Sequence, residues 1–222
     1  MPSLMPAYLD DLQFSGRQME TLTRIGEYQG RQTLYAQQMP EVLQTMLKIA
    51  RVESTESSNR IEGITAPHRR IRGIVLETTN PANRSEQEIA GYRDALQLIH
   101  DSAQDMDVTP NVLRQLHTVL YRYLPQPGGN WKPVDNEIIE RGDDGGVRVR
   151  FKPVSAVATP QAMEDLAQGL RRSWQVEQRP GLVVVPLAVL DFLCIHPFLD
   201  GNGRLSRLLT LLLLYRAGHQ VG

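Results

Sequence analysis

Lysine is scarce in this 222-residue sequence, and neither sign of charge dominates it. Lys48, Lys132 and Lys152 are the only lysines against 21 arginines, for which the base composition of the gene is the simplest explanation. The 24 basic and 25 acidic residues leave a formal net charge of −1. The chain is therefore not a polycation, and its composition gives no reason to expect a nucleic-acid partner.

Cysteine and long apolar runs are also missing. The single cysteine, Cys194, excludes an internal disulfide and a cysteine-rich zinc site. The apolar runs 182–195 and 208–215 are too short to span a bilayer, and Asp191 interrupts the first. The N-terminus lacks the basic and apolar regions of a signal peptide. We therefore expect a soluble cytoplasmic protein with no membrane partner, long enough to bury a sizeable core.

Most of the sequence has helical patterning. Apolar residues recur at spacings of three over Gln18–Gln29, and an amphipathic segment follows Pro40. Ser85 and Glu88 have the spacing of a capping box, which predicts a helix from there to about residue 104. Two further helices, ending near residues 123 and 176, are predicted to begin at N-cap signals followed by proline: Thr109-Pro110 and Thr159-Pro160.

One glycine-rich stretch has strand patterning instead. Apolar residues alternate with Arg148 and Arg150 up to Phe151, and the glycines of 142–146 provide a turn. This pattern predicts a β-hairpin over 137–151. A lone hairpin is marginally stable in water, so it must pack on the helices or serve as a movable flap.

The segment from Ile195 to Arg207 carries the chemistry. An apolar helix is predicted to end at His196-Pro197, and a second begins near Asn202 after a short polar turn. Gly201, Asn202 and Gly203 would offer backbone N–H donors at a helix N-terminus, which is a natural cradle for phosphate oxygens. Arg204 and Arg207 are three residues apart, so both guanidinium groups can lie near the same anion.

Two more side chains fit a phosphate-transfer site. Asp200 precedes the cradle, where a carboxylate oxygen could hold Mg²⁺ against phosphates. His196 ends the preceding helix and could take a proton from an incoming hydroxyl. Each feature alone is common in proteins, but together they resemble a known family. The string HPFLDGNGRLSR over 196–207 matches the Fic domain pattern H-P-F-x-[DE]-G-N-G-R-x-x-R at every fixed position.

This resemblance implies a helical Fic fold and a role for each motif residue. In the family, His196 would deprotonate a target hydroxyl that attacks the α-phosphate of ATP, and Asp200 would coordinate Mg²⁺. Gly201, Asn202 and Gly203 would bind phosphate oxygens. Arg204 would contact the β-phosphate, Arg207 would reach the γ-phosphate, and Phe198 would anchor the loop. Because Gly203 precedes Arg204, the chain resembles the AMP-transferring branch rather than the Doc-like kinase branch, which has lysine at the second glycine.

Two further segments extend the resemblance. Gly129–Lys132, Asn136 and the hairpin resemble the family's flap, which clamps an extended target segment by adding a strand at its edge. The match is loose, because many members have arginine in place of Lys132 and a hydrophobic-Gly pair in place of Glu137-Ile138. Ser58, Glu62 and Gly63 fit the inhibitory pattern [ST]-x-x-x-E-[GN] at the end of the helix that begins near Pro40.

The Fic subclass that carries this pattern on an N-terminal helix is inhibited by the glutamate. In that subclass the glutamate pairs with the second motif arginine, here Arg207, and ATP then binds unproductively. A carboxylate and a guanidinium can pair in this way through two hydrogen bonds. Ser58 lies one turn before Glu62, on the same helix face. The resemblance therefore implies an enzyme that is inhibited by its own N-terminal helix.

Together these features predict an all-α Fic fold with a small β-hairpin flap. Residues 1–84 would form an N-terminal helical region with the inhibitory helix at about 40–63, and 85–222 would form the catalytic core with the flap at about 136–151. The expected activity is protein adenylylation with ATP and Mg²⁺. The alternatives are removal of AMP from a modified protein, with Glu62 positioning a water, and a catalytically idle ATP-sensing module.

The expected partners are ATP and a target protein that presents a Ser, Thr or Tyr hydroxyl. Members of the family often form dimers, so a homodimer is a further expectation. Members of this subclass often continue into a winged-helix DNA-binding domain. Only three residues follow His219, so we expect a shortened chain or a short member without nucleic-acid binding.

Overall fold

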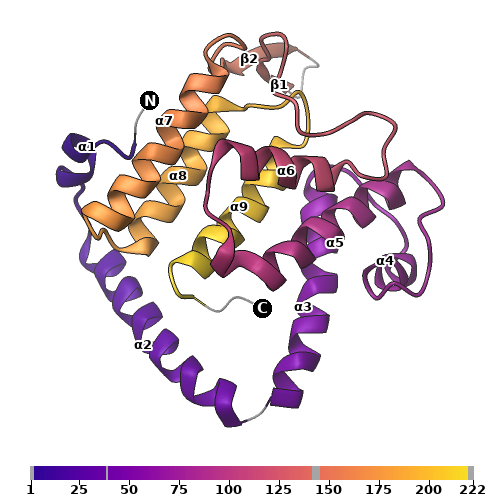
Figure 1. Cartoon of the computed structure of the whole chain (residues 1–222), viewed down its shortest axis with the longest axis horizontal. Coiled ribbons are helices and arrows are strands. Elements are labelled where there is room, and N and C mark those ends of the chain that lie inside the picture. Colours follow the sequence, from indigo (N-terminus) through magenta and orange to yellow (C-terminus); the bar gives the residue numbers. More distant parts are fainter. Residues whose placement is uncertain (1–2, 39, 142–145, 220–222) are drawn as a thin grey trace.

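The computed structural model describes residues 3–38, 40–141 and 146–219, and almost all of its regular structure is helical (Figure 1). A short 3₁₀ turn lies at Ala103–Asp105, and a π-helical turn lies at Arg172–Val176. The α-helices are α1 (Pro6–Asp10), α2 (Gly16–Gln38), α3 (Pro40–Ile61), α4 (His68–Val75), α5 (Arg84–Ser102), α6 (Pro110–Leu120), α7 (Thr159–Arg171), α8 (Gly181–Ile195) and α9 (Asn202–Arg216).

The main core is formed by α5 to α9, with α9 running through its centre (Figure 1). Leu205, Leu208, Leu209, Leu212 and Leu213 recur at spacings of three and four and form one fully buried face of α9, while Leu211 and Leu214 are partly buried and pack against the same core. Neighbouring helices pack closely against each other. At the α5–α6 contact, a Cβ atom on Gly91 would overlap the backbone carbonyl of Leu120. A glycine is therefore required for these two helices to approach each other this closely.

The helix starts were predicted with mixed success. Thr109 caps α6 as expected, because its hydroxyl accepts a hydrogen bond from the Val112 N–H at 3.2 Å. The predicted capping box at Ser85 is wrong. Helix α5 begins at Arg84, and the side chain of Asn83 caps it by accepting the N–H of Glu86 at 3.0 Å. Asn83 is itself a strong capping residue, and it lies two residues before the predicted start.

The predicted cap at Thr159 is also wrong. Ala158 precedes α7, and Thr159 is already its first residue, with its hydroxyl donating to the Ser155 carbonyl at 2.8 Å. Helix α6 ends three residues before the expected end, at Leu120, whereas α7 with its π-helical turn reaches Val176 as predicted. Helix α2 is longer at both ends than the predicted segment.

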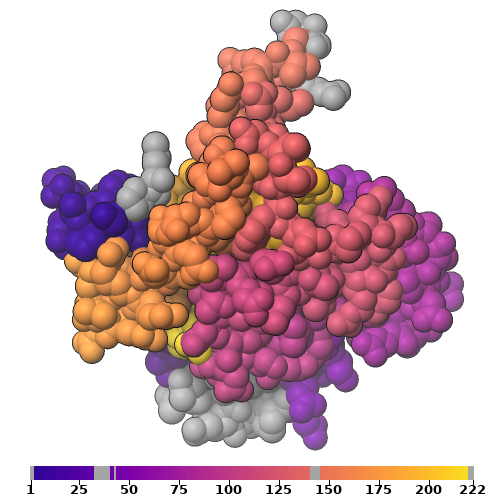
Figure 2. All heavy atoms as spheres, turned by 45° about the horizontal axis from the view of Figure 1, so that its top comes forward, coloured from indigo at the N-terminus to yellow at the C-terminus, as the bar shows by residue number. Residues whose placement is uncertain are grey.

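The predicted β-hairpin is confirmed. Strands β1 (Ile138–Arg141) and β2 (Val147–Phe151) pair antiparallel, with Ile139 opposite Val149 and a bulge between Ile138 and Ile139. Residues 142–145 of the expected turn lie outside the described residues. The hairpin stands out from the helical body, as Figure 2 shows, and the side chains of β2 are exposed. The hairpin therefore has the position expected of a flap.

The N-terminal region places one end of a long helix against the core. In Figure 1, α2 and the first half of α3 extend away from the other helices, and Met46 and Ile49 are exposed there. The C-terminal half of α3 is buried where it packs on α5 and α9. After α3, Gly63 has a φ of +76°, a conformation that suits glycine at a helix end. None of the helices in the described ranges is both long and apolar enough to cross a lipid bilayer.

Candidate active site

The motif loop joins the C-terminus of α8 to the N-terminus of α9, as predicted. His196 ends α8 in the left-handed conformation, with φ 50° and ψ 61°. Gly201, with φ 80°, immediately precedes Asn202, the first residue of α9. The first N–H groups of a helix have no partner within the helix, so this end of α9 presents donors to an anion.

The Asn202 side chain closes this loop. Its Oδ1 accepts the N–H of Phe198 at 3.0 Å, and its Nδ2 donates to the Phe198 carbonyl at 2.8 Å. The residue is only 2% exposed. Both ends of the amide are therefore committed to the loop, and the backbone N–H is the group that Asn202 can offer to a phosphate oxygen.

His117 of α6 packs against the motif loop and fixes its position. Its ring stacks on Phe198, with a centroid distance of 3.8 Å and an interplanar angle of 3°. Its Nδ1 accepts the Gly129 N–H at 2.8 Å, so the hydrogen lies on Nε2, which is 3.0 Å from the Asp200 carbonyl. An imidazolium has no lone pair for the Gly129 N–H. Burial and the Arg204 charge lower the pKa of His117 to about 4, although the Asp200 carbonyl opposes the shift.

Asp200 presents an ionised carboxylate beside the cradle. Its Oδ2 accepts the Tyr121 hydroxyl at 2.9 Å, and its Oδ1 accepts the Gly201 N–H at 2.7 Å. Desolvation opposes ionisation, but these two hydrogen bonds and the Arg204 charge outweigh it, so the pKa of Asp200 lies below its usual value. Its side chain is still 71% exposed. An exposed, hard carboxylate oxygen fits Mg²⁺, which usually takes one or two carboxylates and completes its shell with phosphate and water oxygens.

His196 has the protonation state that a general base requires. Burial is the main cause that lowers its pKa, and the nearby Lys132 charge acts in the same direction, while the Leu193 carbonyl opposes them. Its Nδ1 is buried and has no hydrogen-bond partner among the described residues. The imidazole is therefore neutral at pH 7 and able to accept a proton.

Lys132 and Asn136 tie the base of the hairpin to the motif loop. Lys132 is only 2% exposed, and its Nζ donates to Asn136 Oδ1 at 2.7 Å and to the Ile195 carbonyl at 3.1 Å. The Lys132 N–H donates to the Pro197 carbonyl at 2.8 Å, and Asn136 Nδ2 donates to the Phe198 carbonyl at 3.2 Å. The lysine that departs from the family pattern therefore connects the flap to the loop.

Arg207 is held by the end of α3. Its Nε donates to Ser58 Oγ at 2.6 Å, and its Nη2 donates to the Ser58 carbonyl at 2.9 Å and to Glu62 Oε1 at 2.7 Å. The expected contact between Glu62 and Arg207 is thus present. It uses one carboxylate oxygen, because the Nε side of the guanidinium is taken by Ser58, so the bidentate pairing that we expected does not form.

Gly203 lets the Glu62 carboxylate reach the cradle. A Cβ atom at position 203 would overlap Glu62 Oε1 and lie 3.1 Å from Glu62 Cδ. Gly201 has close neighbours as well, since a Cβ there would lie 3.0 Å from the Tyr121 ring. Glu62 therefore lies against the backbone that would bind a phosphate.

Arg204 has a different partner. It is 1% exposed, and its Nη1 donates to Glu88 Oε2 of α5 at 2.8 Å, while its Nη2 lies 3.8 Å from Asp200 Oδ2. Sequence reasoning expected both motif arginines to face one anion. In the structure, Arg204 pairs with Glu88 of α5, whereas Arg207 is bound by residues at the end of α3. Local sequence patterns gave no indication that Glu88 is the partner of Arg204. His117 was missed for the same reason, since the sequence shows it only as a histidine without metal-ligand spacing.

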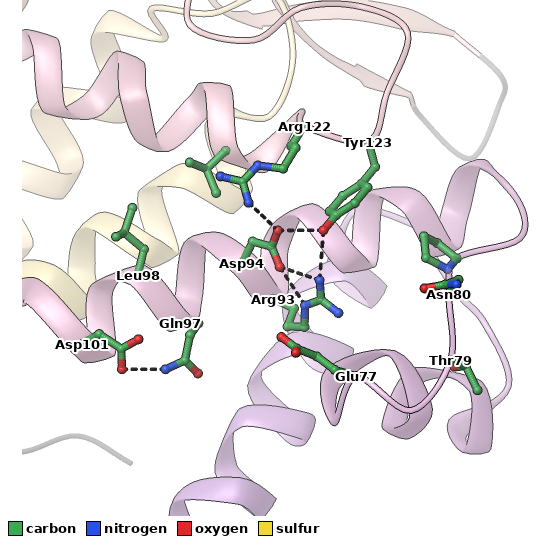
Figure 3. A pocket seen from close by; sticks show the side chains of 12 residues that line it. Glu77, Thr79, Asn80, Arg93, Asp94, Gln97, Leu98, Asp101, Arg122 and Tyr123 are labelled. Carbon is green, nitrogen blue, oxygen red and sulfur yellow. Dashed lines mark hydrogen bonds and ion pairs between the residues drawn. The ribbon is translucent and has the colours of Figure 1, made fainter.

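A cavity of about 600 Å³ lies outside this site, on the outer side of α5. Figure 3 shows Arg93, Arg122 and Tyr123 converging on Asp94. Arg122 and Tyr123 bind one carboxylate oxygen at 3.0 and 2.9 Å, and Arg93 binds the other. These contacts tie α5 to the end of α6. The cavity contains none of the predicted site residues.

The family comparison gives a direct match. Residues 107–214 match the model of the Fic/DOC family. A Fido domain-containing protein of Dictyostelium discoideum is 38% identical over 65 residues, which cover 27% of this chain and 45% of that protein. The chain thus spans less than half of this curated relative. The match to the family model begins at residue 107, beyond α5, so it contains neither Glu62 nor Glu88.

Two crystal structures resemble the fold. A Fic domain-containing signalling protein of Bacteroides thetaiotaomicron aligns with a TM-score of 0.70 at 26% identity, covering 80% of this chain and 66% of that one. A Fic family protein of Desulfovibrio desulfuricans aligns with a TM-score of 0.71 at 24% identity, covering 91% of this chain and 58% of that one, and it supports the fold alone. The predicted fold, a helical Fic fold with a small β-hairpin, is confirmed.

Proposed function

Because the chain belongs to the Fic/DOC family, we propose that it transfers AMP from ATP to a hydroxyl group of a target protein, and that Glu62 holds this activity off. The observation that supports transfer is the arrangement around the N-terminus of α9. A neutral His196, an ionised Asp200 and the backbone of Gly201–Gly203 belong to one loop.

In the proposed reaction, His196, the start of α9 and Asp200 each have a separate role. The target hydroxyl oxygen forms a bond to the α-phosphorus of ATP, and its proton passes to His196. The bond between this phosphorus and the oxygen leading to the β-phosphorus breaks, and pyrophosphate leaves. The N–H groups at the start of α9 stabilise the phosphate charge. Bound Mg²⁺, held by Asp200, would supply further charge neutralisation for the phosphates.

The contacts of Arg207 support the proposed inhibition. A guanidinium bound to Ser58 and Glu62 cannot at the same time orient a γ-phosphate. The ion pair is about one-third exposed on each side, 30% for Arg207 and 36% for Glu62. Exposed ion pairs of this kind contribute about 0.2–1 kcal/mol of stabilisation, so the contact between Glu62 and Arg207 can be broken readily. We place the chain in the subclass with an N-terminal inhibitory helix.

The test is transfer of label from α-³²P-ATP to protein in the presence of Mg²⁺. Glu62→Gly should raise labelling over wild type, and adding His196→Ala should abolish it. Glu62→Gln is the matched control for charge, because it keeps the length of the side chain and should give an intermediate rise. If Glu62→Gly leaves a His196-dependent activity unchanged, inhibition is wrong but transfer stands. If no variant transfers label, the proposed activity is wrong.

A second candidate is the removal of AMP from a modified protein. The Glu62 carboxylate lies against Gly203, and its charge acts on His196, so it is close enough to position a water for attack. Incubating an AMP-modified target with the protein and Mg²⁺ without ATP separates the two reactions, because only hydrolysis then releases AMP. An idle ATP-sensing module would show ATP binding with neither reaction.

A further inference from the structure

Glu88 lies between two arginines of very different exposure. Its Oε2 accepts Arg204 Nη1 at 2.8 Å, and its Oε1 accepts Arg84 Nε at 3.1 Å. The Arg204 side chain is 2% exposed, the Glu88 side chain 10% and the Arg84 side chain 68%. A guanidinium as buried as that of Arg204 needs a counter-charge. Glu88 supplies it, while Arg84 forms an ordinary surface pair.

A second carboxylate faces the same guanidinium. Arg204 Nη2 lies 3.8 Å from Asp200 Oδ2, at the outer limit of an ion pair and beyond hydrogen-bond distance. The Nε of Arg204 is buried without a hydrogen-bond partner among the described residues. Glu88 therefore makes the close contact to Arg204. Asp200 is left with two uncharged donors, Tyr121 and Gly201.

We propose that Glu88 is a positioning residue that keeps Asp200 available to a divalent cation by holding Arg204 away from it. An arginine paired directly with a carboxylate neutralises its charge and competes with a cation for the same oxygens, so it weakens metal binding. Removing the Glu88 charge would leave Asp200 as the nearest carboxylate to a buried cation. This inference rests on the proposed function, because it assumes that Asp200 is the metal ligand.

The proposal predicts changes of opposite sign. In Glu88→Gln, Arg204 should move onto Asp200, so divalent-cation affinity should fall. Changes to residues that support a metal ligand without touching the metal typically cost about 10–100-fold. The same substitution leaves the cradle one unit more positive. ATP binding in EDTA should therefore become a few-fold tighter. A merely structural defect would weaken ATP binding both with and without metal.

The experiment measures binding rather than turnover. Calorimetric ATP titrations in EDTA and in Mg²⁺, and Mn²⁺ titrations followed by electron paramagnetic resonance with ATP present, would be run on wild type, Glu88→Gln and Arg84→Gln. Arg84→Gln is the matched control, because it removes the exposed partner of the same carboxylate and leaves Arg204 in place. It should behave as wild type. Glu88→Gln should bind Mn²⁺ at least about tenfold more weakly.

Equal losses of ATP affinity in EDTA and in Mg²⁺, or an unchanged Mn²⁺ affinity, would overturn the proposal. If Glu88→Gln does not fold, Glu88→Asp takes its place. It keeps the charge but draws it back from Arg204, and it should show a smaller loss of Mn²⁺ affinity without loss of ATP binding in EDTA. The same two outcomes would overturn the proposal for this variant. Failure of the proposed function is read separately, as absence of AMP transfer by a protein that binds Mg²⁺ and ATP.

Discussion

Replacing His117 with glutamine should change how the stability of the protein depends on pH. The buried ring donates from Nε2 to the Asp200 carbonyl and accepts the Gly129 N–H at Nδ1, which only the neutral form can do. An amide nitrogen in place of Nε2 can keep the donation to Asp200 but cannot titrate. His117→Gln therefore removes the pH-dependent part of this contribution, together with the stacking on Phe198.

The magnitude follows from the two pKa values. The pKa of His117 is about 4 in the folded protein and 6.5 in the unfolded chain. Because the folded-state pKa is lower, the unfolded state binds more protons between these values, and stability falls as the pH is lowered. The contribution is complete above about pH 6.5 and is lost as the pH falls towards 4. Between pH 7 and pH 5, the loss from His117 alone is about 2 kcal/mol.

The assay is urea unfolding of wild type and His117→Gln at several pH values from 7.5 to 5, in EDTA so that no metal binds Asp200. The variant should be less stable than wild type at pH 7.5, because it loses the stacking. The gap between the two proteins should then shrink by about 2 kcal/mol at pH 5. His196 and His100 titrate in both proteins and cancel in the difference. A gap that stays constant within about 0.5 kcal/mol across this range would show that burial of His117 does not make folding pH-dependent.

Three further substitutions test separate contacts. Gly91→Ala forces the α5 and α6 backbones apart and should lower the unfolding free energy, measured by urea titration, by about 2 kcal/mol or more. An unchanged midpoint would show that the two helices are not this close. Ser58→Ala removes the acceptor of Arg207 Nε but leaves the Ser58 carbonyl in place, so it should raise AMP labelling only about twofold, less than Glu62→Gly does. No rise would mean that the Ser58 hydroxyl does not contribute to the inhibition. Arg70 and the Ala82 N–H lower the pKa of Glu86 to about 2, so its contribution is complete above pH 4.5 and is lost as the pH falls towards 2. The difference in unfolding free energy between wild type and Glu86→Gln should therefore grow as the pH rises from 2 to 4.5 and stay constant above that, and a difference that does not change with pH over this range would contradict the prediction.

The sequence predicted the parts of the site that are contiguous in the chain. The motif loop and the break between α8 and α9 follow from spacing and from residue types with few alternatives at a helix end. The contact between the end of α3 and Arg207 joins distant parts of the chain and was expected only from the resemblance to the family. Gly63 and Gly201 lie where a positive φ is required, so sequence alone could place both boundaries.

Partners that come from distant elements could not be found in this way. Glu88 fitted a local capping pattern in the sequence, but its side chain is used more than one hundred residues away, on Arg204. His117 gave no local signal either, because its role depends on α6 crossing beneath the motif loop. In both cases tertiary contacts decide what the residue does, and spacing along the chain carries no information about them.

The absence of a side chain at position 203 has a consequence for related sequences. The Glu62 oxygen occupies the volume that a Cβ at this position would take. A residue with a side chain at 203 would therefore displace the Glu62 carboxylate from its present position. A relative with lysine at the position of Gly203 should lack the glutamate, end the helix that carries it earlier, or direct the carboxylate elsewhere. The residue at the second motif glycine would thus indicate, from sequence alone, whether a chain has space for an inhibitory glutamate in this position.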